Sequence, residues 1–513
     1  MSIDNTRSKN IVRNSMVSLI TQILLLLLGF GTRTVFIHLL SAEYLGLDGL
    51  FASILTIFSL AELGIGNALT FSMYKPIATG DIEKAQQLLT LYDKAYRWII
   101  TFIIIVGLVL LPFLPKIVNA DLDHLVVNVY VVYLLFLFNT ISSYFLAYRQ
   151  AVLAVNQYQS TITWYQTLGK IVVYSLECVL LLAFCSYYLY LTVRVAGNYI
   201  IAIMISKKAK KEYPILCEKN DKPLERTEIK RIKNDIYGLF IRRVGSVVMG
   251  SADNIIINSF ISLAMVGIYS NYLLIVSSLQ SITSQFFSAM TATIGNFMAV
   301  ESKDKSEDAF RLYTFMVFVV YGVCTICCIM LVNRFIELLW GSNYVLSKLA
   351  LYLIIINFYF WGFQSAINVF RDTAGLFVQG KYRYLYSTAL NVALSLLLVQ
   401  RMGIEGIILG TIISRLLISV WYDPYILYKI SFKCRPTRYY GRFTIYFCLV
   451  VGFAFLFDKV TSSIPHTISG FIVCLMIGLL VPFTLTIPLI RTAEAKELHT
   501  RIKYFIKEFE RTH

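Results

Sequence analysis

This chain has two halves, each with six long hydrophobic stretches at similar spacing, and a basic stretch lies between the halves. The repeated positions, at offsets of 221 or 222 residues, are Leu45-Gly46-Leu47 and Val266-Gly267-Ile268, Leu91-Tyr92 and Leu312-Tyr313, and Arg149 and Arg371. An even number of spans gives both repeats the same orientation in a membrane. Parallel repeats of this kind indicate a transporter architecture, with the substrate path between the halves.

Composition supports a membrane class. Hydrophobic residues make up 57% of the 513 residues, charged residues 15%, and the mean hydropathy is +0.68. Apolar runs such as residues 99–111 and 471–487 seed helices long enough to cross a hydrocarbon core of about 30 Å. We therefore predict an all-α polytopic membrane protein with about 14 transmembrane helices. Their expected centres are residues 27, 61, 104, 135, 173, 196, 248, 277, 322, 358, 391, 415, 450 and 478.

The spans predict five consecutive regions. These are an N-lobe at 1–206 (spans 1–6), a basic cytoplasmic linker at 207–235, a C-lobe at 236–430 (spans 7–12), a helix pair at 431–490 (spans 13–14) and an amphipathic cytoplasmic tail at 491–513. Most of the 46 Lys and Arg fall in the even loops and the termini, so the positive-inside rule places both termini in the cytoplasm. The net charge of +16 then reflects topology and contact with anionic lipid. No soluble module is present that would carry this charge to a nucleic acid.

The informative residues are ionisable groups inside the spans, since each costs about 2.5 to 3.5 kcal/mol at mid-membrane. Arg33 and Asp48 are equidistant from the apex of one predicted outward hairpin, and Glu177 and Arg194 from the apex of another. Each pair is therefore expected at one depth, within reach of an ion pair. The alternative to a substrate role is that both pairs only neutralise one another to lower the cost of burial.

Other intramembrane charges have no obvious mate at their own depth. The cations Lys170, Arg242, Arg243 and Arg415, together with Arg33 and Arg194, are candidates for a cationic cleft that binds a phosphate or pyrophosphate headgroup. For Arg242 and Arg243, ordinary positive-inside flanking is the alternative. Asp253 and Glu62 are candidates for binding a coupling proton or Na⁺. We expect no catalytic residue, no metal site and no cofactor beyond such a coupling ion.

Several segments resemble one family. They are LSAEYLGLDGLF at 40–51, AELGIGNA at 61–68, MYKPIA at 73–78 with GD at 80–81, YR at 148–149 with NQ at 156–157, ADNIII at 252–257 and VGIYS at 266–270. In order and spacing these are similar to Wzx-type polysaccharide flippases of the multidrug/oligosaccharidyl-lipid/polysaccharide exporter superfamily. The resemblance extends from about residue 10 to 430.

The resemblance implies a fourteen-helix transporter with two six-helix lobes. Such proteins flip undecaprenyl-pyrophosphate-linked oligosaccharide repeat units across the bacterial plasma (inner) membrane by alternating access, for capsule, exopolysaccharide or O-antigen biosynthesis. Span 7 carries functional charge in this family, and Arg242, Arg243 and Asp253 are the matching positions here. The implied partners are the lipid-linked oligosaccharide and membrane lipids, with a polysaccharide polymerase or export machinery as a further candidate.

Two rival functions remain. A multidrug or organic-cation exporter of the same superfamily should favour carboxylates and aromatic groups over the basic groups found here. A membrane polysaccharide polymerase needs an extracytoplasmic catalytic loop or domain, and the longest predicted outward loops are around fifteen residues. The sequence therefore favours a flippase, not an enzyme.

Overall fold

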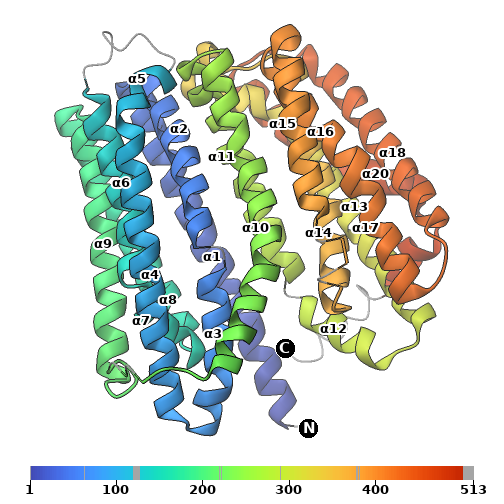
Figure 1. Ribbon diagram of the computed structural model, residues 1–513. Helices are drawn as coiled ribbons and strands as arrows, with labels where there is room; N and C mark the ends of the chain where they lie inside the picture. Colours follow the sequence, from blue (N-terminus) through green and yellow to red (C-terminus); the bar gives the residue numbers. More distant parts are fainter. Residues whose placement is uncertain are drawn as a thin grey trace. The chain divides into compact units, whose positions relative to one another are not determined.

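The computed structural model describes residues 2–62, 64–118, 127–218, 220, 222–288, 290–376, 379–380 and 382–500, and every regular element within them is helical (Figure 1). The helices are α1 (Ser2–Leu39), α2 (Ala42–Phe58), α3 (Ile65–Thr79), α4 (Ile82–Leu110), α5 (Leu114–Ile117), α6 (Val129–Phe145), α7 (Ala147–Val155), α8 (Gln159–Phe184), α9 (Tyr187–Glu212), α10 (Arg226–Phe260), α11 (Leu263–Ser288), α12 (Thr291–Val300), α13 (Lys303–Trp340), α14 (Lys348–Thr373), α15 (Arg383–Met402), α16 (Ile404–Ser414), α17 (Val420–Leu427), α18 (Thr437–Ser462), α19 (Ile468–Gly478) and α20 (Val481–Thr486).

The protein is an all-α polytopic membrane protein. Among the described residues, 12 helices are long and apolar enough to cross a membrane, or 13 if the bent pair α6–α7 forms one span. The seventh predicted span lies in α10, which is not among them. The C-terminal half of α10 is interrupted by Arg242, Arg243 and Asp253 and by several Ser and Asn residues, so α10 holds no membrane-length stretch that is apolar enough. The second predicted span also differs, because the span covers Ala42–Ala61 and does not centre on residue 61.

Local sequence explains where many helices begin and end. The side chains of Asp81, Ser186, Ser347 and Thr467 each accept a hydrogen bond from a backbone N–H in the first turn of the helix that follows. Such caps satisfy donors that have no partner within the helix. Gly80 ends α3 with a φ of 73°, a left-handed conformation that glycine adopts without strain. The spans are therefore separated by short, locally specified turns.

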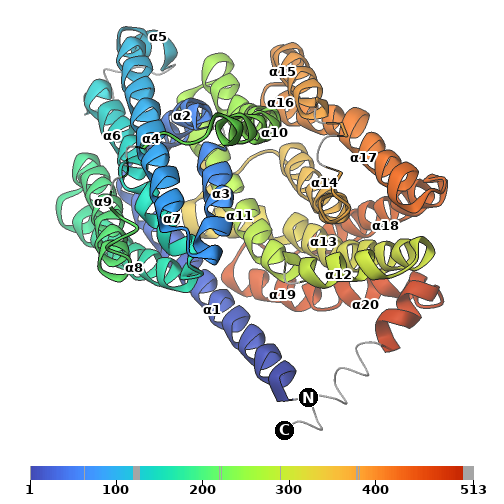
Figure 2. The same cartoon turned by 60° about the horizontal axis from the view of Figure 1, so that its bottom comes forward.

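The chain divides into two compact units, and the first comprises Met1–Ser270 with Tyr384–Val392. Within this unit α8 packs against both α9 and α1 (Figure 2). Helix α2 packs against α10 and α6, and α3 packs against α4. Phe51, Tyr133 and Leu47 are fully buried between these helices, and Phe51 meets the Tyr133 ring edge-on at 5.4 Å. The packing places the mid-span residues of α2, α8 and α9 against one another.

Two equivalent positions of the internal repeat touch within this first unit. A Cβ added at Gly46 would lie 2.1 Å from the carbonyl oxygen of Leu263, and one added at Gly267 would lie 2.2 Å from that of Ala42. Gly46 and Gly267 are separated by 221 residues, and so are Ala42 and Leu263. The contact is therefore reciprocal, and it requires glycine on both helices because only glycine permits backbones to approach this closely.

The second unit comprises Asn271–Arg383 and Ala393–His513. Its central helix is α13, which packs against α14, α18, α19 and α20. Aromatic side chains fill this core, and the Phe318 ring stacks on Tyr446 of α18 at 4.3 Å. A Cβ at Gly362 of α14 would lie 2.4 Å from the Tyr321 ring, so this glycine lets α14 approach α13. These large rings therefore pack α13 closely against its neighbouring helices.

The predicted basic linker is attached to the first unit. Gln86 Nε2 donates to the Ile215 carbonyl oxygen at 2.7 Å, and Lys222 Nζ lies 2.6 Å from Glu83 Oε1. Lys84 Nζ lies 2.6 Å from the carboxylate of Glu228. These contacts hold the linker across the start of α4. Of the predicted amphipathic tail, residues 501–513 lie outside the described residues, and the lobe boundaries drawn from the sequence stay a prediction.

Candidate functional site

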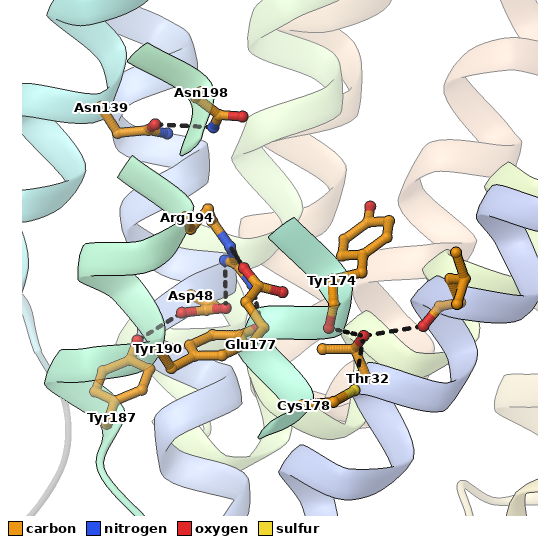
Figure 3. Close-up of polar contacts among 11 residues, drawn as sticks. Thr32, Asp48, Asn139, Tyr174, Glu177, Cys178, Tyr187, Tyr190, Arg194 and Asn198 are labelled. Atoms are coloured by element: carbon orange, nitrogen blue, oxygen red, sulfur yellow. Dashed lines mark hydrogen bonds and ion pairs between the residues drawn. The ribbon is translucent and has the colours of Figure 1, made fainter. Parts of the chain in front are cut away.

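A buried ion cluster joins three helices of the first unit. Arg194 of α9 lies between two carboxylates, with its Nε 2.9 Å from Glu177 Oε1 of α8 and its Nη1 3.1 Å from Asp48 Oδ2 of α2 (Figure 3). The Tyr187 hydroxyl donates to Asp48 Oδ1 at 2.5 Å. Arg194 also hydrogen-bonds the Tyr190 hydroxyl, and its guanidinium lies 4.4 Å from the centroid of that ring. Three side chains therefore contact the arginine directly, and Tyr187 holds one of the three in place.

The burial of this cluster is uneven. The Glu177 side chain is 0% exposed, that of Asp48 12% and that of Arg194 27%. A charge in such surroundings is costly unless it is paired and hydrogen-bonded. The polar surface continues along α9, where Asn198 Nδ2 donates to Asn139 Oδ1 of α6 at 3.0 Å (Figure 3).

The sequence predicts one ion pair of this cluster, Glu177 with Arg194, but not the other, Asp48 with Arg194. Glu177 and Arg194, paired by depth on neighbouring helices, form an ion pair. Depth also pairs Asp48 with Arg33, but the described ion pair of Asp48 is with Arg194. Arg33 Nη2 donates to Ser270 Oγ. The pairing of Arg33 with Asp48 stays a prediction.

Glu62 lies directly after the second span, which ends at Ala61. Gly64 adopts a φ of 79° before α3 begins. The Tyr96 hydroxyl donates to Glu62 Oε1 at 2.7 Å, and the Tyr92 ring stacks on Tyr96 with centroids 4.6 Å apart. A Cβ at Gly66 would meet the Tyr96 hydroxyl at 2.4 Å. The role of Glu62 in binding a coupling ion stays a prediction.

The remaining predicted residues of the first unit are spread over two helices. Lys170 is exposed near the middle of α8, and Asp253 is half-buried on α10. Arg242 and Arg243 also lie on α10, and the structure does not describe their side chains. Their proposed roles therefore stay predictions.

Arg415, the sixth predicted cation, belongs to the second unit. It begins a π-helical segment, Arg415–Ser419, between α16 and α17, and its side chain is half-buried. Single π-helical turns inside α-helices are frequent at functional sites. The π-helical segment shifts the helix faces of the residues that follow it, which the sequence periodicity does not reveal.

Sequence reasoning missed a second buried ion cluster, in the second unit. Arg371 Nη1 of α14 lies 2.6 Å from Asp423 Oδ1 of α17, and Arg383 pairs with the same carboxylate. Gln364 donates to its other oxygen, and Arg371 Nη2 donates to the Gln379 carbonyl oxygen at 2.6 Å. Asp423 is 0% exposed. One signal was available, because Arg371 is the repeat partner of Arg149.

The clusters differ in their balance of charge. In the first unit one guanidinium forms ion pairs with two carboxylates, whereas in the second unit two guanidiniums form ion pairs with one carboxylate. Among the residues that the structure describes, no group of three His, Cys, Asp or Glu side chains could hold a metal ion.

Known proteins share this fold. A structure described as the lipid II flippase MurJ in an inward closed conformation has a TM-score of 0.61 at 15% identity, covering 92% of this chain and 98% of that chain. An inward-facing multidrug resistance MATE family transporter of the MOP superfamily has a TM-score of 0.59 at 12% identity, covering 80% and 99%. A point mutant of the Vibrio cholerae MATE transporter VcmN has a TM-score of 0.55 at 14% identity, covering 84% and 98%.

These likenesses establish that the chain shares its fold with the MurJ and MATE structures. No curated protein matches the sequence. The family described as "Polysaccharide biosynthesis protein" matches residues 11–294, more than half of the chain. The chain therefore belongs to the family described as polysaccharide biosynthesis protein.

Proposed function

We propose that this protein is a flippase that moves undecaprenyl-pyrophosphate-linked oligosaccharides across the bacterial plasma membrane. The family assignment supports a role in polysaccharide biosynthesis. The fold likeness to a lipid II flippase, which covers most of both chains, supports a lipid-linked substrate. In this proposal both termini are cytoplasmic, as the distribution of Lys and Arg predicts. The protein moves its substrate without chemical change and is not an enzyme.

The position of Lys170 is the main observation that supports an anionic substrate. It lies 11 residues from the start of α8 at Gln159 and 14 from its end at Phe184, or about 16 and 21 Å along the helix axis. Its side chain is exposed on the protein. From this depth a lysine cannot reach either membrane interface, and a lipid-facing charge would cost about 2.5 to 3.5 kcal/mol. We therefore assign Lys170 to a water-filled cavity, where its ammonium group faces the pyrophosphate.

The cations differ in their availability to a substrate. Arg194 already serves Asp48 and Glu177, so it binds an anion only if one of these contacts is released. Arg415, in the π-helical segment, is the guanidinium that we assign to the substrate in the second unit. Arginine can bind a diphosphate through two parallel hydrogen bonds, which lysine cannot do.

We propose alternating access as the mechanism, with the cavity open first to the cytoplasmic and then to the outer side while the polyprenyl chain stays in lipid. Outward movement of a headgroup with two negative charges is favoured by an inside-negative potential. The gain is about 2.3 kcal/mol per charge per 100 mV. The driving force therefore favours export of the lipid-linked oligosaccharide.

Transport by Lys170→Gln and Arg415→Gln variants in proteoliposomes tests the proposal. We expect both to lose most of the flipping of an undecaprenyl-pyrophosphate oligosaccharide, because each removes a cation that offsets desolvation of the headgroup. Lys222→Gln, which alters an exposed linker lysine paired with Glu83, is the matched control and should flip normally. Unchanged flipping in both cavity variants would refute the cationic site.

A multidrug exporter is the second candidate, favoured by the fold likeness to a MATE family transporter and by the two carboxylates that share Arg194. The two functions predict opposite results in an ethidium efflux assay. A flippase leaves ethidium accumulation unchanged in cells that express the protein. An exporter lowers it.

A further inference from the structure

The ion cluster of the first unit holds one carboxylate oxygen without a partner. Glu177 Oε1 accepts from Arg194, but Oε2 is buried and has no hydrogen-bond partner in the described part of the chain. The side chain is 0% exposed, so bulk water does not solvate this oxygen. Asp48, in contrast, has partners on both oxygens, Arg194 and Tyr187. Glu177 is therefore the acid of the cluster whose ionised form is less well stabilised by hydrogen bonds.

The charged groups around Glu177 come from several helices. When both acids are ionised, Asp48, Glu177 and Arg194 together carry a net charge of −1 before any other group is counted. The other titratable or charged groups around them are Arg33 on α1, Tyr174 and Cys178 on α8, and Tyr187 and Tyr190 on α9. Arg33 donates to the neutral Ser270 hydroxyl, so its positive charge still acts on the cluster. The orphaned oxygen of Glu177, and not the net charge, therefore singles out this residue.

A buried, ionised carboxylate oxygen without a donor is unfavourable. A proton on Oε2 removes the charge from that oxygen, and Oε1 still accepts from Arg194. Two carboxylates held close together commonly share a proton. Asp423 shows the opposite case, since two guanidiniums hold it and favour its ionised form.

We propose that Glu177 is a proton-binding site, and that loading and release of a proton at Oε2 accompanies transport. The link to transport rests on the proposed flippase function, whereas proton binding does not. When Glu177 gains a proton, the cluster becomes more positive by one charge and Arg194 loses its ionic attraction to one acceptor. Arg194 is then free to turn toward an anionic headgroup. The proton and the substrate are thus coupled through one arginine.

Infrared difference spectroscopy of the purified protein tests proton binding without any substrate. Lowering the pH from about 8 to about 5 should produce a protonated-carboxyl C=O stretching band that is lost in Glu177→Gln. Glu83→Gln, which changes an exposed glutamate on α4, is the control and should keep the band. Glu177→Asp should keep a protonated-carboxyl band at a shifted frequency, which separates loss of the carboxyl group from misfolding. Persistence of the band in folded Glu177→Gln would overturn the proposal.

Flipping measured in proteoliposomes at different internal and external pH tests the coupling. The wild type should respond to the pH difference, and Glu177→Gln should flip at a rate that no longer responds. A pH response retained in Glu177→Gln but lost in Asp253→Asn or Glu62→Gln would overturn the assignment. If the wild type flips no lipid-linked oligosaccharide, the proposed function fails, and the infrared result alone then decides whether Glu177 binds a proton.

Discussion

Replacement of Gly46 by alanine tests the reciprocal crossing of the repeats. The new Cβ would lie 2.1 Å from the Leu263 carbonyl oxygen, whereas ordinary contacts begin at 3.4 Å. The helices must therefore separate by about 1.3 Å (3.4 − 2.1). Overpacking of this kind costs about 1 to 3 kcal/mol. Alanine also favours the helix by up to about 1 kcal/mol relative to glycine, which offsets part of the loss.

Gly29→Ala is the matched control, because a Cβ at Gly29 on α1 would meet nothing within 4 Å. Both variants gain the same helix propensity, so the difference between them isolates the clash. We expect Gly46→Ala to unfold at a temperature at least about 2 °C below that of Gly29→Ala. The measurement is thermal unfolding in detergent at one scan rate, followed by tryptophan fluorescence. Equal melting temperatures would refute the close crossing.

The double variant Gly46→Ala/Gly267→Ala tests the reciprocity. Each added Cβ faces the backbone of the other helix, at Leu263 and at Ala42. One separation of the two helices relieves both clashes, so the combined loss of stability should be clearly smaller than the sum of the single losses. Fully additive losses would indicate two independent contacts.

Two further predictions concern charged and titratable groups of the second unit. Asp423→Ala should lower the free energy of unfolding by about 3 to 5 kcal/mol, because Arg371 and Arg383 would stay buried without their carboxylate; unaltered thermal unfolding would contradict this. Cys434 should be alkylated slowly near pH 8, because burial and its hydrogen bond to the Glu307 carboxylate raise the pKa of the thiol to about 11. The thiolate fraction is then about a hundredfold below that of an ordinary cysteine, and Glu307→Gln should speed alkylation, as measured by mass spectrometry.

The predicted pairing of Glu177 with Arg194 shows how far depth along the sequence leads. Helices joined by a short turn run antiparallel, so residues equidistant from the turn lie at one depth. The rule fails for helices that are distant in the chain. Asp48 on α2 reaches Arg194 on α9, and no local pattern links them. For the same reason the sequence does not reveal the cluster around Asp423, whose partners come from α14 and α15.

Hydrophobicity and charge along the chain determined the helical membrane class and the approximate place of most spans, because these depend on the cost of placing each residue in lipid. The family followed from the resemblance of several short segments. The repeat makes Gly46 and Gly267 equivalent positions, but it does not predict that their helices touch. The tertiary structure alone decided that Asp48 also binds Arg194 and that Tyr96 donates to Glu62 just beyond the second span. It also decided that the oxygen left without a donor belongs to Glu177. These outcomes depend on which helices become neighbours, and burial then sets the energy of each charge.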